Sequence, residues 1–479
     1  MPSFRPVLHL LSLILLVLGA AMLLPALFDL RAGWQVFVGS SAVTITCAGA
    51  LYLSSRGGST KLDIRQAFLL TSFAWTGISA FAALPFALAN LDGVSYADGF
   101  FEAVSGLTTT GSTVLVGLDE MPRGILVWRA LLQWLGGIGI IVMAIAILPF
   151  LRVGGMQLFR AESSERNQFN LRIRDFSRLI IECYLTLTLL CMFAYWVGGM
   201  TLFDAFAHAL TTLATGGYST SDQSMGKWPQ PMVQWAAVTF MLAGALPFLL
   251  YIQVLRGRPL ELWRDPQVRW FLTLVTAFVL YTATRLWLEH DETPLQALTL
   301  AAFNVVSIIT TTGYASTDYT LWGNWAVLLF FFIMFLGGCS GSTAGAIKIY
   351  RFYVLAQSAL AQLKRLIHPH GVFLIVYRNR QIDESVRASV AGFVLLFFVT
   401  VAVVTLSLTA MRLDFLTAIS AATTALTNVG PGLGDVVGPA STFRALPEPA
   451  KWLLSAAMLL GRLELFTILV LFMPRFWRG

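Results

Sequence analysis

The sequence has little charge. Only 12% of its 479 residues are Asp, Glu, Lys or Arg, whereas 57% are hydrophobic. Soluble globular proteins carry about 25% charged residues, so this composition excludes an ordinary soluble domain. Apolar runs of about twenty residues recur along the chain, and a run of that length can cross a bilayer as a helix. The sequence therefore predicts an all-α polytopic membrane protein.

Residues that hold metals or carry out catalysis are also scarce. The five histidines are scattered, no Walker A pattern occurs, and the four cysteines fit no zinc spacing: Cys47, Cys183, Cys191 and Cys339. Because they lie in or beside apolar segments, we expect buried thiols. A membrane-embedded enzyme would need converging acids, bases or ligands, and we find only Arg462 and Glu464 inside an apolar run. We expect neither an enzyme nor an organic cofactor.

The net charge of +7 does not point to nucleic-acid binding, because of where the basic residues lie. They cluster in alternate loops, above all in 152–178 and 361–387, which is the positive-inside pattern of membrane proteins. We expect both termini in the cytoplasm, and anionic lipid or a regulatory subunit as partners of the basic loops. Ten spans are predicted, at about 8–28, 34–54, 66–90, 122–150, 178–199, 231–255, 268–289, 322–352, 388–411 and 452–472.

Four loops on the opposite side each hold a semi-apolar stretch that is too short to cross a bilayer. Such a stretch is a candidate for a re-entrant helix. The four stretches are 96–107, 201–213, 293–309 and 413–426. Each is followed by a Thr/Gly segment: TTTGST (108–113), ATGGYST (214–220), TTTGYAST (310–317) and TNVGPGLG (427–434). A unit that recurs in this way indicates a repeat architecture.

The repeats divide the chain into five parts. Each repeat contains a helix, a short helix, a glycine-centred segment and a second full helix, and two lead helices precede the first repeat. We place the two lead helices in 1–60 and the four repeats in 61–155, 156–260, 261–365 and 366–479.

The Thr/Gly segments predict a pore. Irregular backbone within a bilayer is tolerated only where protein buries it or where it lines a water-filled cavity. Four such segments can meet around one axis, where their carbonyl oxygens replace the water around a cation. Glycine permits the dihedral angles that this needs, and the C-terminal ends of the short helices favour a cation. One Thr-Gly pair is more often an ordinary turn, but four in register indicate a common role.

With these repeats, the chain resembles the Trk/Ktr/HKT superfamily of cation transporters, and its two lead helices resemble those of the TrkH/TrkG branch. The resemblance covers essentially the whole chain. It implies a potassium-channel-like fold with ten transmembrane helices and four re-entrant pore helices, in four M1–P–M2 repeats with pseudo-fourfold arrangement. It also implies a potassium filter built from backbone at Thr109, Thr110, Gly111, Ala214, Thr215, Gly216, Thr311, Thr312, Gly313, Asn428, Val429 and Gly430.

A second element interrupts the span predicted at 322–352. Seven of the ten residues in 337–346 are Gly, Ser or Thr, and glycine costs about 1 kcal/mol in a helix interior. We expect the helix to break there; a packing surface of small residues is the alternative. The resemblance implies that 337–346 is an intramembrane loop that gates conduction. The residues assigned to gating are Gly337, Gly338, Ser340, Gly341, Ser342, Gly345, Lys348 and Arg462.

Arg462 and Glu464 are expected near the middle of the last apolar helix. An arginine there costs about 2.5–3.5 kcal/mol on insertion scales, so it normally faces a polar cavity or a partner. An ion pair with Glu464 is the alternative, but residues two apart do not share a helix face. The resemblance implies that Arg462 projects into the pore as an electrostatic barrier. Lys348 either approaches the same path or extends to the cytoplasm.

The resulting prediction is potassium uptake across the bacterial inner membrane. The alternative is a sodium-permeable or sodium/potassium transporter of the same fold, because Ala214, Asn428 and Val429 break the Thr pattern of the filter. The resemblance further implies a homodimer and a cytoplasmic, nucleotide-binding regulatory ring similar to TrkA.

Overall fold

The computed structural model describes residues 4–30, 33–57, 62–146, 169–290, 292–378 and 380–478. Most of the predicted basic loop 152–178 lies outside these residues. The predicted boundaries at residue 60 and between residues 155 and 156 lie outside them as well.

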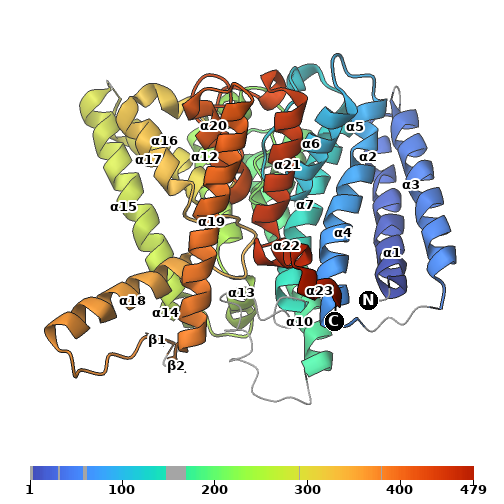
Figure 1. Ribbon diagram of the computed structural model, residues 1–479. Coiled ribbons are helices and arrows are strands. Elements are labelled where there is room, and N and C mark those ends of the chain that lie inside the picture. Colours follow the sequence, from blue (N-terminus) through green and yellow to red (C-terminus); the bar gives the residue numbers. More distant parts are fainter. Residues whose placement is uncertain are drawn as a thin grey trace.

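Long apolar helices form the frame of the molecule (Figure 1). In the described residues, seven are long and apolar enough to cross a membrane: Arg5–Ala26 (α1 Arg5–Ala21 with α2 Leu23–Ala26), Trp34–Ser55 (α3), Ile64–Leu88 (α4 Ile64–Ala82 with α5 Leu84–Leu88), Arg123–Ile141 (in α7 Arg123–Ala146), Ser177–Val197 (in α10 Phe169–Val197), Pro266–Glu289 (α15) and Glu384–Ala410 (α19). The prediction of a helical, multi-pass chain is confirmed.

Two predicted spans are bent instead of continuous. Helices α12 (Pro231–Ala245) and α13 (Phe248–Leu255) meet at 97°, and α21 (Glu448–Arg462) meets the segment of α22 (Phe466–Leu469) at 105°. At the first break Pro247 cannot donate a helical hydrogen bond. At the second, Glu464 and Leu465 have positive φ angles of 57° and 22°, which a right-handed helix does not allow. Arg462 therefore ends a helix, and its predicted place in mid-helix is wrong.

The predicted break in the third repeat is present. Helix α17 (Asn324–Ile333) stops after ten residues, and the chain runs without helix until α18 (Ile349–Ile367). A short parallel bridge between Leu336 and Ile347 closes the base of the loop 337–346. Helix α18 then leads to a small hairpin of β1 (Val376–Tyr377) and β2 (Arg380–Gln381), on the side of the termini in Figure 1.

The four predicted short helices form within two residues of their expected ends: α6 (Tyr96–Leu107), α11 (Leu202–Leu213), α16 (Pro294–Ile309) and α20 (Phe415–Thr427). Each has an N-cap whose side chain accepts a backbone N–H three residues on: Ser95, Thr201, Thr293 and Asp414. At 1.5 Å per residue the longest spans about 24 Å, which is short of the roughly 30 Å hydrocarbon core. In Figure 1 the labelled α6, α16 and α20 lie toward the end opposite the termini.

The outside of the bundle is apolar, as a lipid-facing surface must be. Leu189 and Phe193 on α10 and Leu395 and Leu406 on α19 are examples of large exposed side chains. Helix α3 lies at the periphery beside α1, and its Cys47 is exposed. The prediction of four buried thiols is therefore wrong for this residue and confirmed for the other three: Cys183, Cys191 and Cys339.

Candidate functional site

The four short helices end with the same backbone conformation. Two residues after the end of α6, α11 and α16, and one residue after the end of α20, a non-glycine residue takes a positive φ, and a glycine two positions later does so again. We call the stretches that follow the helices the glycine segments: 108–113, 214–219, 310–315 and 427–432. The first positive-φ residues are Thr109, Thr215, Thr311 and Asn428, with φ of 52°, 50°, 59° and 55°; the glycines are Gly111, Gly217, Gly313 and Gly430, with φ of 87°, 78°, 81° and 113°.

Backbone hydrogen bonds align the four glycine segments with one another in the same way as the φ angles do. In each segment the N–H of the residue between these two positions donates to the carbonyl five residues earlier: Thr110 to Ser105, Gly216 to Thr211, Thr312 to Ser307 and Val429 to Thr424. In the second segment the central glycine is therefore Gly217. The sequence prediction, which used Gly216, placed this segment one residue early. Ala214 corresponds to Thr108 and Gly216 to Thr110.

The glycines join the four segments into a closed ring. A Cβ added to any of them would press on a backbone carbonyl of the next segment, and the fourth returns to the first. The distances from that Cβ to the carbonyl oxygen are 2.1 Å from Gly111 to Gly216, 1.9 Å from Gly217 to Thr312, 2.0 Å from Gly313 to Val429 and 2.7 Å from Gly430 to Thr110. Only residues without a Cβ permit this approach.

The residues after the glycines reach the opposite way around the ring. Ser112 Oγ donates to the Gly430 carbonyl at 2.7 Å. Tyr218 Oη donates to carbonyls of the first repeat, at 2.9 Å to Glu102. Tyr314 Oη pairs with the Thr211 hydroxyl, and the Pro431 ring packs beside Gly313. Each segment is thus held by both neighbours.

Polar side chains inside the short helices hold the chain that leaves the ring, and the sequence prediction did not include them. The buried Glu102 carboxylate accepts from the Val114 N–H at 3.0 Å and the Thr113 hydroxyl. At the equivalent positions of the next two helices, His208 contacts the Ser219 hydroxyl and Asn304 accepts the Ser316 N–H. In the fourth repeat, Ser420 accepts the Leu433 N–H at 3.0 Å.

Glu102 is itself paired. Arg129 of α7 donates Nε to Glu102 at 2.7 Å, and its other nitrogens reach the Ser219 carbonyl and the Thr113 hydroxyl. Its guanidinium lies 4.1 Å from the centroid of the Tyr218 ring. Ionisable residues in apolar runs are functional candidates. The acidic and basic residues within "FFEAV" (100–104) and "VWRALL" (127–132) could therefore have indicated this pair from the sequence.

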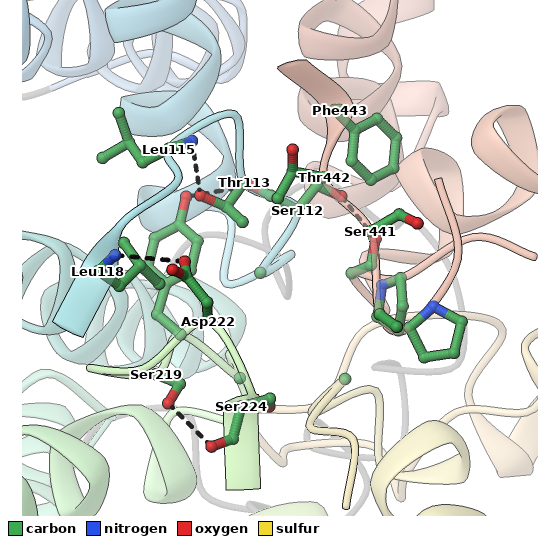
Figure 2. A pocket seen from close by; sticks show the side chains of 18 of the residues that line it. Ser112, Thr113, Leu115, Leu118, Ser219, Asp222, Ser224, Ser441, Thr442 and Phe443 are labelled. Carbon is green, nitrogen blue, oxygen red and sulfur yellow. Dashed lines mark hydrogen bonds between the residues drawn. The ribbon is translucent and has the colours of Figure 1, made fainter. Parts of the chain in front are cut away.

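Above the ring lies a cavity of about 370 Å³, lined by the four central glycines, by small polar residues and by apolar residues such as Leu115 and Phe443. Figure 2 shows Ser112 and Thr113 from the first repeat, Ser219, Asp222 and Ser224 from the second, and Ser441 from the fourth around it. The Asp222 carboxylate accepts from the backbone N–H groups of Gly117 and Leu118.

The outer loops of the first two repeats are tied together beside this cavity. Lys227 Nζ lies 2.6 Å from the Asp119 carboxylate, which also accepts from Ser221 and the Asp222 N–H. Partial burial acts to raise the pKa of Asp119, but the hydrogen bonds from Lys227, Ser221 and Asp222 outweigh it, and the net effect is a lowered pKa.

Below the ring, the loop 337–346 contacts the second, third and fourth glycine segments or the helices that lead to them. The Gly345 N–H donates to Thr311 Oγ1 at 2.6 Å, and the Ala346 N–H donates to the Thr427 carbonyl at 2.8 Å. Thr343 Oγ1 donates to the Leu213 carbonyl at 3.1 Å. The loop therefore lies directly under the ends of α11, α16 and α20.

Arg462 lies close by at the end of α21. Its side chain is 3% exposed, and its guanidinium nitrogens have no hydrogen-bond partner in the described part of the chain. Glu464 pairs with Arg351 at 2.6 Å, so the alternative of an Arg462–Glu464 pair is wrong. Lys348 donates to the Ala344 carbonyl inside the loop and lies within electrostatic reach of Arg462.

The chain is similar to known cation transport proteins in sequence and in overall structure. The family model TrkH, described as cation transport protein, matches residues 33–478. The Trk system potassium uptake protein TrkI of Halomonas elongata is 45% identical over 99% of this chain and 97% of its own. The Trk system potassium uptake protein TrkH of Vibrio parahaemolyticus is 39% identical over the full length of both chains. The crystal structure of the potassium transporter TrkH from that organism superposes with a TM-score of 0.92, at 36% identity, over 99% of this chain and 100% of that one.

Proposed function

Because this chain belongs to the TrkH family of cation transport proteins, we propose that it takes up potassium across the bacterial inner membrane. The observation that carries the proposal is the closed ring of four glycine segments. Its members come from four points of the chain about a hundred residues apart, and a ring of backbone is the structure from which carbonyl filters are made.

In this proposal the ring is the selectivity filter. An ion that leaves water for a medium of low dielectric constant loses tens of kcal/mol of solvation by Born estimates, so carbonyl oxygens must replace its hydration shell. The ligands are carbonyls in the two positions before each central glycine: Thr109 and Thr110, Thr215 and Gly216, Thr311 and Thr312, and Asn428 and Val429. The C-terminal ends of the short helices each contribute roughly half a negative charge toward the cation.

We propose that the frame around the filter has four M1–P–M2 repeats in pseudo-fourfold arrangement and ten membrane crossings. The seven continuous helices, the two bent pairs and the interrupted α17 support this count in the described residues. The equivalent backbone of the four glycine segments supports the fourfold relation.

The intramembrane loop and Arg462 form the gate in this proposal. The loop is bonded to the filter segments, and the buried Arg462 cation stands next to it. A positive charge in a low-dielectric path repels a potassium ion strongly. When the loop moves aside, the inside-negative potential draws potassium inward with about 2.3 kcal/mol per charge per 100 mV.

We propose that both termini and the hairpin are cytoplasmic, as the distribution of basic residues predicts. Figure 1 supports a common side for the termini and the hairpin. The partners in this proposal are a second copy of the chain, anionic lipid at the basic loops, and a TrkA-like nucleotide-binding ring. The Trk system names of the relatives support an assembly of several components.

Sodium permeation is the second candidate, because the four segments are chemically unequal. The position before the central glycine is Thr110, Gly216, Thr312 or Val429. Thr110 and Thr312 are held by the hydroxyls of Thr108 and Thr310, at 2.7 and 2.8 Å, whereas Gly216 and Val429 have no hydroxyl to hold. The second segment is held differently, because the buried Gln133 donates Nε2 to the Gly216 carbonyl at 2.6 Å. The four sides are thus constrained by different groups.

The experiment that tests the proposal is growth rescue at low potassium, in a bacterial strain without its own potassium transporters. Wild type should rescue, and Gly313→Ser should not, because the new side chain would lie 2.0 Å from the Val429 carbonyl oxygen. Gly117→Ser is the matched control, since Gly117 has a similar φ of 74° and open space around it. Equal rescue by Gly313→Ser would overturn the filter assignment, and equal uptake of sodium and potassium by wild type would favour the second candidate.

A further inference from the structure

The hairpin of β1 and β2 is fixed to the helices that flank the intramembrane loop. Its residues Ile375, Tyr377 and Ile382 share a small apolar cluster with Val354 of α18 and Val386 of α19. The Ile382 N–H donates to the Ile375 carbonyl at 2.8 Å, which closes the hairpin. This cluster is separate from the main core of the molecule.

Tyr377 extends from the hairpin to the start of α15. Its side chain is 3% exposed, and its hydroxyl donates to the Asp265 carboxylate at 3.2 Å. The same hydroxyl accepts from Gln267 Nε2 at 2.7 Å. Asp265 caps α15 by accepting the Gln267 N–H at 2.8 Å, and it pairs with Arg378 of the hairpin at 2.8 Å.

Gln267 continues from Tyr377 into the intramembrane loop. Its Oε1 accepts the backbone N–H of Ser340 at 2.9 Å. The side chain is 5% exposed, so water does not compete freely for either bond. The amide orientation is the one that both partners allow, because the Ser340 N–H can only donate while the tyrosine hydroxyl can accept. One buried side chain therefore joins the hairpin to the loop.

Tyr377 also contacts the other flank of the loop. Its ring packs edge-on against Tyr350, with the centroids 5.3 Å apart. Tyr350 lies in the first turn of α18, where the Ile349 N–H donates to the Gly338 carbonyl at 3.2 Å. Tyr377 thus reaches both the Ser340 side and the Gly338 side of the loop.

We propose that Gln267 and Tyr377 are positioning residues that hold the intramembrane loop against the filter, and that displacement of the hairpin releases the loop through them. The inference rests on the proposed function, because it takes the loop as the gate. It adds the physical route: hairpin, Tyr377 hydroxyl, Gln267 amide, Ser340 N–H. The loop then passes the motion to the filter through Gly345 and Thr311.

A native cysteine makes the test possible. Cys339 stands in the loop next to Ser340 and is fully buried, and Cys191 of α10 is equally buried far from the hairpin in sequence. Full-length protein in proteoliposomes is treated with a small thiol reagent, and the modification rate of each cysteine is read by mass spectrometry of its peptide. Potassium flux is measured on the same vesicles.

Tyr377→Phe and Gln267→Leu should each raise the Cys339 rate and the potassium flux by at least roughly twofold to tenfold, because each removes at least one neutral hydrogen bond of the link. The Cys191 rate should not change. The double variant should exceed neither single variant by much, because both cut the same link. Tyr96→Phe is the control, since it removes a tyrosine hydroxyl bonded to the Ala80 carbonyl at the start of α6, a helix that Figure 1 shows toward the end of the molecule opposite the hairpin.

Unchanged Cys339 modification in Tyr377→Phe and Gln267→Leu would overturn the link, and so would effects that simply add in the double variant. A rise in Cys191 modification of the same size would also overturn it, because it would report general loosening. Failure of the proposed function looks different: wild-type vesicles would then carry no potassium flux, whatever the thiol rates.

Discussion

Replacing Gly217 with alanine should abolish potassium-selective uptake. Gly217 has a φ of 78°, and an L-residue there costs about 1–2 kcal/mol. In addition, the alanine Cβ would lie 1.9 Å from the Thr312 carbonyl oxygen. Real Cβ atoms essentially never approach closer than 3.0 Å, so the Thr312 strand must retreat by about 1.1 Å. A functional site tolerates displacements of about 0.5 Å, so a proposed ligand would be lost.

Gly117→Ala separates the backbone cost of a positive φ from the steric contact of the new Cβ. Gly117 has nearly the same φ, 74°, and nothing lies within 4 Å of an added Cβ. It should therefore show only the backbone cost of about 1–2 kcal/mol, with uptake and selectivity retained. Both variants and wild type are compared by potassium and sodium uptake in a strain without potassium transporters, at matched membrane expression.

The result that would refute the reasoning is wild-type uptake and selectivity in Gly217→Ala. It would mean that the second segment does not face Thr312, and that the register with Gly217 at the centre is mistaken. Loss of function in Gly117→Ala to the same degree would show that backbone strain alone accounts for the effect.

Three further changes test other parts of the structure. Arg462→Ala should raise cation flux severalfold, because it removes a buried charge without a hydrogen-bond partner among the described residues, next to the loop 337–346. Flux through proteoliposomes that is unchanged or lower would contradict a barrier. Arg129→Met should lower the free energy of unfolding by about 3–5 kcal/mol, since it leaves the Glu102 carboxylate buried without its cation. Thermal unfolding in detergent measures this loss of stability. A loss of stability smaller than that caused by Lys227→Met would contradict the prediction. Asp119→Asn should destabilise the outer loops only above the pKa of folded Asp119. Because that pKa is lowered, the contribution of Asp119 is complete above the unfolded value of about 3.9 and is lost as the pH falls through the folded pKa. A difference in melting temperature that does not shrink as the pH is lowered below about 3.9 would contradict the assignment.

Much of the site was predictable because it depends on local residue preferences. Short apolar stretches with capping residues ahead of them predicted the four short helices to within two residues. The density of Gly, Ser and Thr in 337–346 predicted the break after α17, since these residues lose little by leaving a helix.

The register of the second segment shows where such reasoning stops. Gly216 and Gly217 are adjacent, and the sequence prediction took Gly216, although the central glycine is the fourth residue in the other three segments, which favours Gly217. The choice follows from the end of α11, where the Gly216 N–H still donates to Thr211, and from the Thr312 carbonyl, which leaves no room for a side chain at Gly217. The second of these contacts exists only after distant segments have met.

By itself, therefore, the amino-acid sequence determined the class of protein, the short helices, the four Thr/Gly segments and the break in the third repeat, because hydropathy and backbone preference act over a few residues. Tertiary structure alone decided that Gly217 lies against the Thr312 carbonyl, that Arg351 and not Arg462 pairs with Glu464, and that Gln267 joins the hairpin to the loop. These contacts join residues between 73 and 113 positions apart. Such partners are chosen by packing in three dimensions, and no local pattern records them.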